Sequence, residues 1–331
     1  MTGQVRRHDV AIVGLGLMGQ RHAEVVAAYP RARLAAVVEV DPERGRAAGE
    51  RFGCPAFTDL ASALEGVHLD AALICTPDAL HVAPTVEALE AGLHVLLEKP
   101  IATTLDDADT IIAAAARRPE LVLTVGHCLR FDPKYVALQR RVGAGAIGDV
   151  VGVATRRQNR VSAQVRLRGR ISSQQFLGVH DYDVINWIVG ARPTEVVAMS
   201  TDRVMRSLGH PIDDMTFTNI RYDSGAIAMA ETGWMLAEGS PLPYRFELDA
   251  FGSAGNAHLE VFDEGLSIAH DRYELLSTLD RLTPQIAHFL DCIEAAAPPL
   301  VSGLDARVAL QIALASEASA ASGRPIPLPP T

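Results

Sequence analysis

The sequence predicts an α/β protein whose N-terminal half folds as a doubly wound parallel sheet. Two observations support this prediction. A glycine motif directly follows a short apolar run near residue 10, and apolar runs then alternate with helical patterns up to residue 127. Strands that alternate with helices at short spacing form a parallel sheet covered by helices on both faces.

The apolar run 10–13 ends in GLGLMG, which places Gly14, Gly16 and Gly19 at GxGxxG spacing before a helical pattern. In such a motif the first glycine permits a tight turn, the second lets a pyrophosphate approach the backbone, and the third lets the helix pack on the strand. The helix N-terminus then offers free N–H groups to the phosphates. The motif therefore predicts a dinucleotide site.

A second apolar run, 34–40, places Glu39 at the end of the next strand, 20 residues beyond Gly19. An acid at about this distance accepts hydrogen bonds from the adenosine ribose hydroxyls. It would repel a 2′-phosphate, so NAD is predicted rather than NADP. Asp41 is the alternative acid, although DPERG is typical of a turn and a helix start, and Arg44 is the residue that could favour NADP.

The alternation continues with strands expected at 69–76, 94–99 and 121–127 and helices at 78–92 and 105–118. Gly92 is a candidate C-cap, and Thr103 or Thr104 a candidate N-cap. Ligands of doubly wound sheets bind outside the carboxyl ends of the strands. Three stretches fall there: CTP at 75–77, EKP at 98–100 and GHCLRFDP at 126–133.

The composition is that of a globular protein of about two domains, with 331 residues, 48% of them hydrophobic and 21% charged. No apolar run approaches the ~18 residues of a membrane span, and no signal peptide is expected. The net charge of -10 argues against a nucleic-acid partner. The four cysteines lack CxxC spacing, so no metal site and no disulfide framework is expected, and the predicted location is the cytoplasm.

The motifs GLGLMG, CTPDALH, EKP and GHCLRFDP occur in this order, and LGVHDYDVINWIVG follows at 177–190. With them the chain resembles the Gfo/Idh/MocA family of nicotinamide-dependent oxidoreductases, which act mostly on sugars, inositols and their derivatives. The resemblance implies a Rossmann dinucleotide-binding domain at 1–128. It also implies an α+β domain at 129–331, with an open, mainly antiparallel sheet that binds substrate and forms homodimers or homotetramers.

The second half of the chain fits this expectation. We expect strands at 149–159, 194–203, 214–234 and 244–261, with turns at 223–225 and 252–255. A helix is expected at 174–190, and two helical stretches follow residue 279. The tail RPIPLPPT is expected to be an extended or mobile end.

The resemblance assigns the chemistry to Lys99 and His180. Lys99 would hydrogen-bond the substrate hydroxyl and help to pass its proton, while Glu98 would orient the lysine or bind cofactor. Pro100 is expected to follow a cis peptide bond. His180 would accept the hydroxyl proton, since an imidazole titrates near neutral pH. The alternatives are a solvated lysine and a histidine that only caps or packs its helix.

Asp183 lies three residues beyond His180, on the same helical face, and could orient the ring. Asp181 is expected to be a solvated acid at a helix start. Many family members carry an aspartate four residues before this histidine, whereas this chain has Phe176. The departure leaves Lys99 and His180 as the proton-handling pair and predicts an aromatic wall where a carboxylate usually binds a hydroxyl.

Further residues are assigned by the same resemblance. The cofactor would be lined by Leu17, Met18, Thr76 and Pro77. His81 would either hold this loop or contact the ligand, Arg130 would either bind substrate or form a structural ion pair, and Trp234 would either line the pocket or anchor a strand.

The segment from Arg156 to Arg170 carries six arginines. It is either a solvated loop, a contact to another subunit, or a lid that presents guanidinium groups to an anionic substrate such as a sugar acid or nucleotide sugar.

The sequence therefore predicts a dehydrogenase that transfers hydride between NAD(P) and a secondary alcohol of a sugar, inositol or related polyol. Two alternatives remain open. One is a family branch that cleaves glycosides by transient oxidation with tightly held NAD, and the other is a non-catalytic regulator that binds NAD and a sugar.

Overall fold

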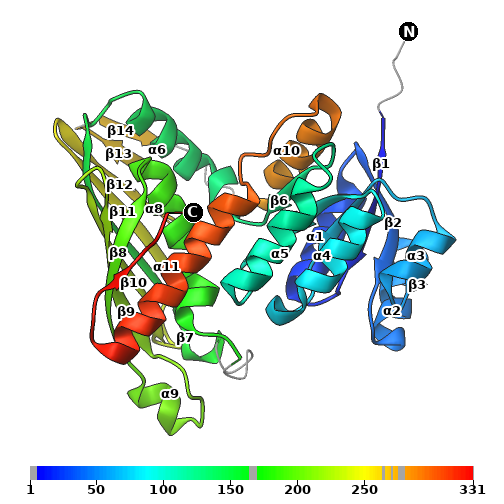
Figure 1. The fold of residues 1–331 in the computed structure, drawn as a ribbon, viewed down its shortest axis with the longest axis horizontal. Coiled ribbons are helices and arrows are strands. Elements are labelled where there is room, and N and C mark those ends of the chain that lie inside the picture. Colours follow the sequence, from blue (N-terminus) through cyan, green and yellow to red (C-terminus); the bar gives the residue numbers. More distant parts are fainter. Residues whose placement is uncertain (1–5, 164–169, 263–264, 270, 275–279, 331) are drawn as a thin grey trace. The chain divides into compact units, whose positions relative to one another are not determined.

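The computed structural model describes residues 6–163, 170–262, 265–269, 271–274 and 280–330 (Figure 1). The chain forms two compact units: residues 1–128 with 280–307, and residues 129–279 with 308–331. The division expected from the sequence placed 280–307 in the second domain. In the structure they join the first unit, because Ile286, Phe289 and Leu290 share a core with that unit's strands.

The first unit is a six-stranded parallel sheet with strand order β3-β2-β1-β4-β5-β6. This is the order of doubly wound dinucleotide-binding sheets, and the predicted fold is confirmed. The strands are β1 His8–Val13, β2 Ala32–Val38, β3 Ala56–Phe57, β4 Ala71–Ile74, β5 His94–Leu97 and β6 Leu123–Val125.

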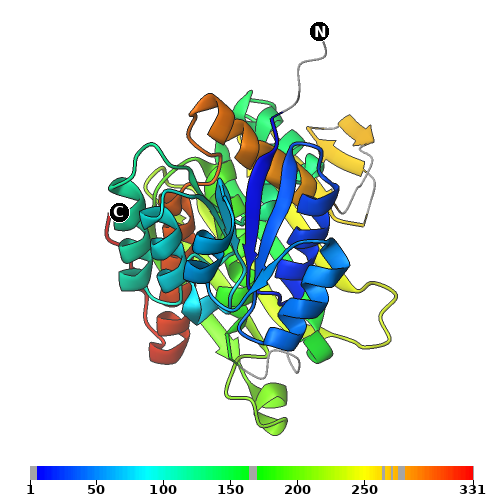
Figure 2. The same ribbon diagram turned by 90° about the vertical axis from the view of Figure 1, so that its right-hand side faces the viewer.

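Helices of the first unit flank the blue strands β1 and β2 in Figure 2, so these strands are buried on both faces and are almost entirely apolar. The helices are α1 Leu17–Ala28, α2 Pro42–Phe52, α3 Leu60–Gly66, α4 Val82–Glu90, α5 Leu105–Ala116 and α10 Leu282–Ala295, with the 3-10 turn η1 Asp78–Leu80 before α4. A second 3-10 turn, η2 Cys128–Phe131, crosses from the first unit into the second.

The second unit is built on a nine-stranded sheet with order β14-β13-β12-β11-β7-β10-β9-β8-β15. Its neighbours are antiparallel except for β7 and β10, which confirms the predicted mainly antiparallel sheet. The strands are β7 Val150–Arg160, β8 Pro193–Thr201, β9 Met215–Tyr222, β10 Ile227–Leu236, β11 Tyr244–Gly252, β12 Gly255–Glu260, β13 Gly265–Ile268, β14 Asp271–Glu274 and β15 Ile326–Pro327.

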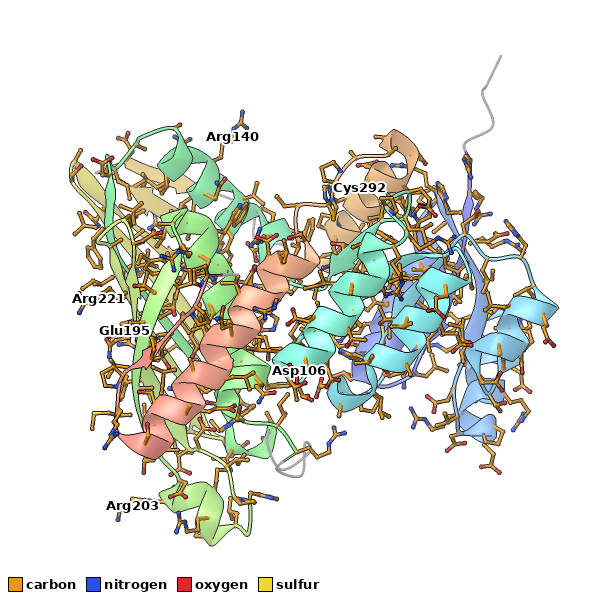
Figure 3. The ribbon with its side chains drawn as sticks, in the orientation of Figure 1. Asp106, Arg140, Glu195, Arg203, Arg221 and Cys292 are labelled. Carbon is orange, nitrogen blue, oxygen red and sulfur yellow. The ribbon has the colours of Figure 1, made fainter. Side chains whose placement is uncertain are left out.

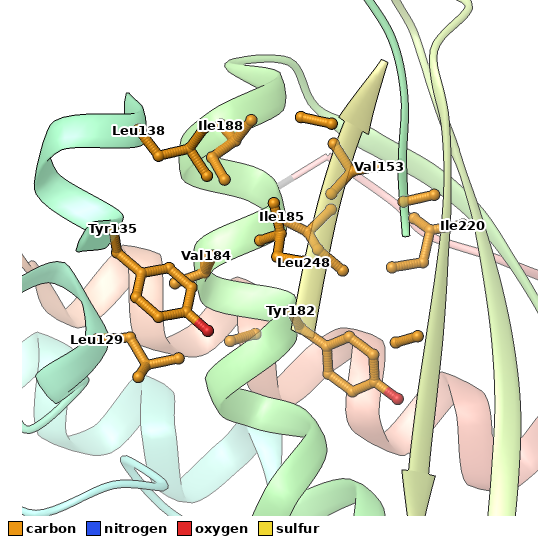
Figure 4. Packing of buried hydrophobic residues seen from close by; sticks show 14 of the residues in the cluster. Leu129, Tyr135, Leu138, Val153, Tyr182, Val184, Ile185, Ile188, Ile220 and Leu248 are labelled. Atoms are coloured by element: carbon orange, nitrogen blue, oxygen red, sulfur yellow. The ribbon is translucent and has the colours of Figure 1, made fainter. Parts of the chain in front are cut away.

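One face of this sheet carries the core of the unit. Helices of the second unit lie on that face in Figure 1, and Figure 4 shows Tyr182 and Ile185 of α8 packed toward Val153, Ile220 and Leu248 of the strands. The helices of the unit are α6 Pro133–Gly143, α8 Val179–Val189, α9 Arg203–Ser207 and α11 Gly303–Ser322, whose first residues belong to the first unit, together with the π-helical turn η3 Gln174–Gly178.

The opposite face of the sheet is recognised from the alternation of burial along the strands. In β9, residues 216, 218, 220 and 222 are buried, whereas Phe217 and Arg221 point the other way and are exposed. Figure 3 shows Glu195 and Arg221 projecting from this face, where Arg221 Nε lies 3.5 Å from Glu195 Oε1.

The C-terminal tail, expected to be extended or mobile, forms the edge strand β15, in which Ile326 pairs with Val196 and Pro327 with Glu195 of β8. The expected helix at 174–190 is also present, but its first turn is the π-helical turn η3. Within the described part of the chain, every helix falls short of the length or the apolar character that crossing a bilayer demands.

Candidate functional site

The fold itself requires two of the three glycines in the turn at the end of β1. Gly14 has φ +91°, a conformation that favours glycine. A Cβ on Gly19 would lie 1.9 Å from the Gly14 carbonyl oxygen, so only glycine lets α1 approach this closely. A Cβ on Gly16 would meet nothing within 4 Å, so the protein itself does not require glycine there. The open space above Gly16 fits the approach of a cofactor phosphate.

Glu39 lies beside this turn with 6% of its surface exposed. Its Oε2 accepts a hydrogen bond from Leu15 N at 2.8 Å and its Oε1 accepts one from Asp41 N at 3.2 Å. Asp41, the alternative ribose acid, caps α2 instead by accepting from Glu43 N and Arg44 N. Arg44 donates to Glu39 Oε2 at 3.1 Å, so the residue that could have favoured NADP is paired with the acid that favours NAD.

Three exposed apolar side chains surround the same edge of the sheet. Leu17, Val40 and Leu80 follow the ends of β1, β2 and β4 and are 61%, 83% and 60% exposed. Met18 and Thr76 are half-buried and Pro77 is exposed at this edge. Apolar side chains around a few polar groups are typical of cofactor sites.

His81 is fully buried and fastens two loops at this edge. Its Nδ1 lies 2.8 Å from the Pro100 carbonyl oxygen and its Nε2 lies 3.1 Å from the Thr76 carbonyl oxygen. Both ring nitrogens are therefore occupied by backbone. This geometry supports the loop-holding role over the direct ligand contact that the sequence left open.

The EKP stretch follows β5, and the expected cis bond between Lys99 and Pro100 is confirmed. Glu98 is buried, and its Oε1 lies 2.7 Å from Nε2 of His22 on α1. Burial opposes its ionisation, but the hydrogen bond from His22 and the charges of His22, Lys99 and His81 hold the pKa of Glu98 below its ordinary value. Lys99 is half-buried beside it.

Sequence analysis missed His22. The available signal was its spacing, because a residue three positions after Gly19 lies on the same face of α1, which packs against the sheet.

In the second unit His180 is half-buried near the start of α8, immediately after η3. A buried polar network holds this turn. Gln174 donates from Nε2 to Thr232 Oγ1 at 2.7 Å, and Tyr182 donates from its hydroxyl to Gln174 Oε1. Ser173 N donates to Asp213 Oδ1 at 3.0 Å. The network fixes the path of the chain that leads to His180, and π-helical turns are frequent at functional sites.

The two acids that follow His180 are both buried in ion pairs. Arg130 donates from Nε and Nη2 to the two carboxylate oxygens of Asp183, at 3.0 and 2.7 Å. Arg157 pairs in the same way with Asp181, which is 2% exposed. The prediction that Asp181 is solvated is therefore wrong, and burial raises the pKa of Asp181 even though Arg157 opposes the shift.

These pairs bear on two predicted site residues. For Arg130 the alternative of a structural ion pair is realised, and its guanidinium also lies 5.5 Å from the centre of the Trp187 ring. Asp183 uses both carboxylate oxygens for this pair. Its orientation of His180 remains a prediction.

Phe176 is half-buried and its ring centroid lies 5.7 Å from that of Trp234. Trp234 is fully buried together with Leu177 and Met205. A fully buried indole offers no surface to a ligand, which favours the anchoring role of Trp234 over the substrate contact predicted for it. Phe176 is the member of this cluster that could still contact a substrate.

The arginine-rich segment is not one uniform surface. Arg156 lies between Glu231 and Glu247, at 2.8 Å from each, and Arg157 is buried against Asp181. Arg160 donates to the carbonyl oxygens of residues 240 and 242. These three arginines belong to β7, so a solvated loop or a lid is wrong for them. Residues 164–169 lie outside the described residues.

Asp9, His68 and Asp70 bring their ligand atoms within 4.8 Å of one another. However, Arg33 donates two hydrogen bonds of 2.6 Å to the carboxylate of Asp9. A guanidinium in this position occupies the acceptor oxygens that a cation would need, and no metal site is assigned to this group.

The first unit thus has the strand order, glycine turn and acidic residue of a dinucleotide-dependent oxidoreductase. Residues 8–127 match the family model described as "Oxidoreductase family, NAD-binding Rossmann fold", and residues 135–258 match the C-terminal domain model of the same family. The chain belongs to the GFO/IDH/MocA family, and it is an oxidoreductase that uses NAD.

Individual relatives agree with this assignment. The chain is 27% identical to scyllo-inositol 2-dehydrogenase (NAD(+)) of Bacillus subtilis (strain 168), over 99% of this chain and 97% of that protein. It is 26% identical to myo-inositol 2-dehydrogenase of Thermotoga maritima, over 96% and 98%. The structure of scyllo-inositol dehydrogenase from Lactobacillus casei with NAD(H) and scyllo-inositol shares the fold, with a TM-score of 0.86, 22% identity, and coverage of 97% and 99%.

The steric difference between Gly16 and Gly19 gives a matched pair of variants. We expect Gly16→Ala to keep the wild-type melting temperature but to weaken NAD binding by about tenfold or more, because only a bound pyrophosphate would meet the new methyl group. Gly19→Ala should lower the melting temperature, since overpacking costs about 1–3 kcal/mol. Thermal melting and calorimetric titration with NAD measure both effects, and unchanged NAD affinity in Gly16→Ala would contradict the site.

Proposed function

We propose that this protein oxidises a secondary alcohol of an inositol or related polyol, with NAD as hydride acceptor. The observation that carries the proposal is Lys99, which follows β5 at the carboxyl edge of an NAD-binding sheet. The inositol dehydrogenases that align with nearly the whole chain indicate the substrate class.

The lysine content of the chain supports a chemical role for Lys99. The sequence has 28 arginines but only two lysines, Lys99 and Lys134. Lys134 is 2% exposed and donates from Nζ to the carbonyl oxygens of Glu260 and Val261, at 3.0 and 2.8 Å, which is a structural role. Arginine cannot give up its proton in proteins, whereas a lysine amine can. A chain that otherwise uses arginine thus has a titratable amine at the end of β5.

The proposed mechanism uses few side chains. Lys99 hydrogen-bonds and polarises the reacting hydroxyl, and His180 accepts its proton as hydride leaves the carbon. NAD, when bound, supplies nicotinamide C4 as the hydride acceptor. Glu39 would accept from the ribose hydroxyls, with Gly14, Gly16 and Gly19 at the pyrophosphate. Leu17, Met18, Thr76 and Pro77 would border the cofactor.

One specific observation favours a second candidate. Phe176 stands where many family members carry an aspartate, and its packing on Trp234 gives that position an apolar character. A regulator that binds NAD and a sugar without catalysing hydride transfer would tolerate this change better than a dehydrogenase.

The deciding experiment is absorbance at the reduced-nicotinamide band, with NAD or NADP and a panel of inositols, aldoses, sugar acids and nucleotide sugars. A rise with inositols and NAD supports the proposal. Thermal stabilisation by NAD without an absorbance rise on any alcohol would favour the second candidate. Glycoside cleavage without accumulation of reduced cofactor would identify the glycoside-cleaving enzyme.

Replacement of Lys99 tests its role. We expect Lys99→Ala to lower kcat by at least about 100-fold, the usual effect of losing a proton-transfer group, while NAD affinity stays nearly unchanged. Lys99→Arg should be similarly impaired, because it keeps the charge but cannot release a proton. Steady-state kinetics measure the loss, and activity within about tenfold of the wild type, 1.4 kcal/mol, would exclude a catalytic role.

We further propose that the protein forms a homodimer or homotetramer through the sheet face opposite α8. Exposed apolar side chains gather there on neighbouring strands: Val197, Met199, Phe217, Ile227 and Phe251. Val197, Ile227 and Phe251 line a shallow cavity of about 350 Å³ on this face. Exposed apolar patches of this kind mark association surfaces. The cysteines are free, which is consistent with a cytoplasmic protein.

Ile227→Asp tests this surface, because Ile227 pairs with Gly152 near the centre of the sheet and is 58% exposed. An uncompensated buried carboxylate costs about 3–5 kcal/mol, so the subunit dissociation constant should rise by about 100-fold or more. Leu208 is also exposed, at 48%, but lies just after α9 and not on this sheet face. Leu208→Asp is therefore the matched control and should not dissociate the oligomer. Analytical ultracentrifugation measures the outcome, and a monomeric wild type would refute the proposal.

A further inference from the structure

A buried hydrogen bond joins α1 to the stretch after β5 that carries Lys99. His22 of α1 is fully buried, and its Nε2 lies 2.7 Å from Oε1 of Glu98, which is 6% exposed. Nδ1 of His22 has no hydrogen-bond partner among the described residues, so the ring acts on Glu98 through Nε2 alone.

The second carboxylate oxygen of Glu98 is also held. Oε2 accepts a hydrogen bond from the backbone N of Lys99 at 3.2 Å. Gly126 packs against the carboxylate so closely that a Cβ there would lie 3.3 Å from Cδ of Glu98. The carboxylate is thus fixed in one position at the base of Lys99.

The charges around Glu98 come from several elements. His22 lies on α1, Lys99 follows β5, and His81 precedes α4; all three favour the ionised carboxylate, against the effect of burial. Cys75 lies just after β4, and the pKa of its thiol is raised mainly by burial and further by the negative charge of Glu98. Glu98 is therefore an anion in a buried setting that would otherwise disfavour it.

We infer that His22 is a positioning residue for Lys99: it holds Glu98 as a fixed, ionised carboxylate, and this carboxylate gives the Lys99 ammonium its anionic neighbour. The inference rests on the proposed function in that it takes Lys99 to act on the substrate. It adds a link that the mechanism above does not contain, from the helix that receives the cofactor phosphates to the lysine.

If the His22–Glu98 pair had only a structural role, replacing His22 would have different effects. Such a pair would tie α1 to β5 and contribute stability, but it would not change the charge state next to Lys99. The two roles separate if the hydrogen-bond donor is removed while the side-chain volume is kept. His22→Leu removes the donor, and His22→Gln places an amide N–H near the position of Nε2 with a similar volume.

The low lysine content makes Lys99 a usable reporter. Reductive methylation with ¹³C-formaldehyde labels only Lys99, Lys134 and the α-amino group, and the signal missing in Lys99→Arg assigns Lys99. The chemical shift of this signal is followed between about pH 5 and pH 8 in the full chain saturated with NAD, a window that covers an elevated carboxyl pKa.

In the wild type, Glu98 should stay ionised throughout this window, because its pKa lies below the ordinary value. In His22→Leu, burial is no longer opposed by the hydrogen bond, so the pKa of Glu98 should rise by about one unit or more. Protonation of Glu98 should then appear within the window as an inflection of the Lys99 signal. The double variant His22→Leu/Glu98→Gln should lack this inflection while retaining any inflection that His81 or Cys75 causes. His22→Gln should follow the wild type.

The inference is overturned if His22→Leu shows no inflection that the double variant lacks, or if His22→Leu and His22→Gln change the titration equally. In the second case the ring would act by packing alone. Circular dichroism melts confirm that each variant is folded at the start of the window.

The activity readout is separate from this titration. If the wild type oxidises a polyol, the acid limb of its kcat/KM profile should move to higher pH in His22→Leu and return in His22→Gln. If the wild type oxidises no substrate, the proposed function fails, while the titration of Lys99 still decides whether His22 controls Glu98.

Discussion

The contact between Gly19 and the carbonyl oxygen of Gly14 sets the position of α1, and the arrangement of the first unit depends on that position. With no side chain between them, the helix starts directly at the carboxyl edge of the sheet. Its N-terminus then faces the place where we propose that the cofactor phosphates bind, and His22, one turn further on, reaches Glu98. A single steric constraint thus places both the cofactor turn and the carboxylate beside Lys99.

The second unit depends on a different constraint, the two-residue period of its strands. One set of side chains, such as Thr218 and Ile220, faces α8 and the buried core, while the alternate set, such as Phe217, faces away. The polar network around Gln174 interrupts the apolar core where η3 leads into α8. Burial of this many polar groups is tolerated because they satisfy one another, and the segment that carries Phe176 and His180 is held by that network.

Local sequence patterns predicted those parts of the fold that depend only on residues close together in the chain. The glycine spacing, a helix cap at Thr103 or Thr104 and the turn at 223–225 follow from residue preferences over a few positions, and the structure has all three, with Thr104 as the cap. The helix start at DPERG was expected, and α2 begins there, but α3 and β3 were not assigned, because 56–66 carries only a weak apolar period. The inclusion of 280–307 in the first unit depends on packing that no local pattern records.

The candidate site shows the same limit. Asp41 was correctly placed at a helix start, because capping is a local property, whereas the ribose contact of Glu39 remains a prediction. The burial of Asp181 against Arg157 was missed, because the partner lies on β7, 24 positions earlier in the chain. Likewise His22 meets Glu98 across 76 positions. Such pairs form only when the sheet and helices assemble, so a charged residue near a motif does not reveal its partner.

The proline-rich ending has a consequence for how the large sheet can grow. Leu328, just after β15, donates its backbone N–H inward to Thr194 of β8, so the alternate positions in and beside β15 direct their backbone nitrogens toward the outer edge. Those positions are Pro325, Pro327 and Pro329, none of which has an N–H to donate. An added strand would find half of its ladder missing. Strand addition at this border of the sheet is therefore disfavoured, because fewer hydrogen bonds could form.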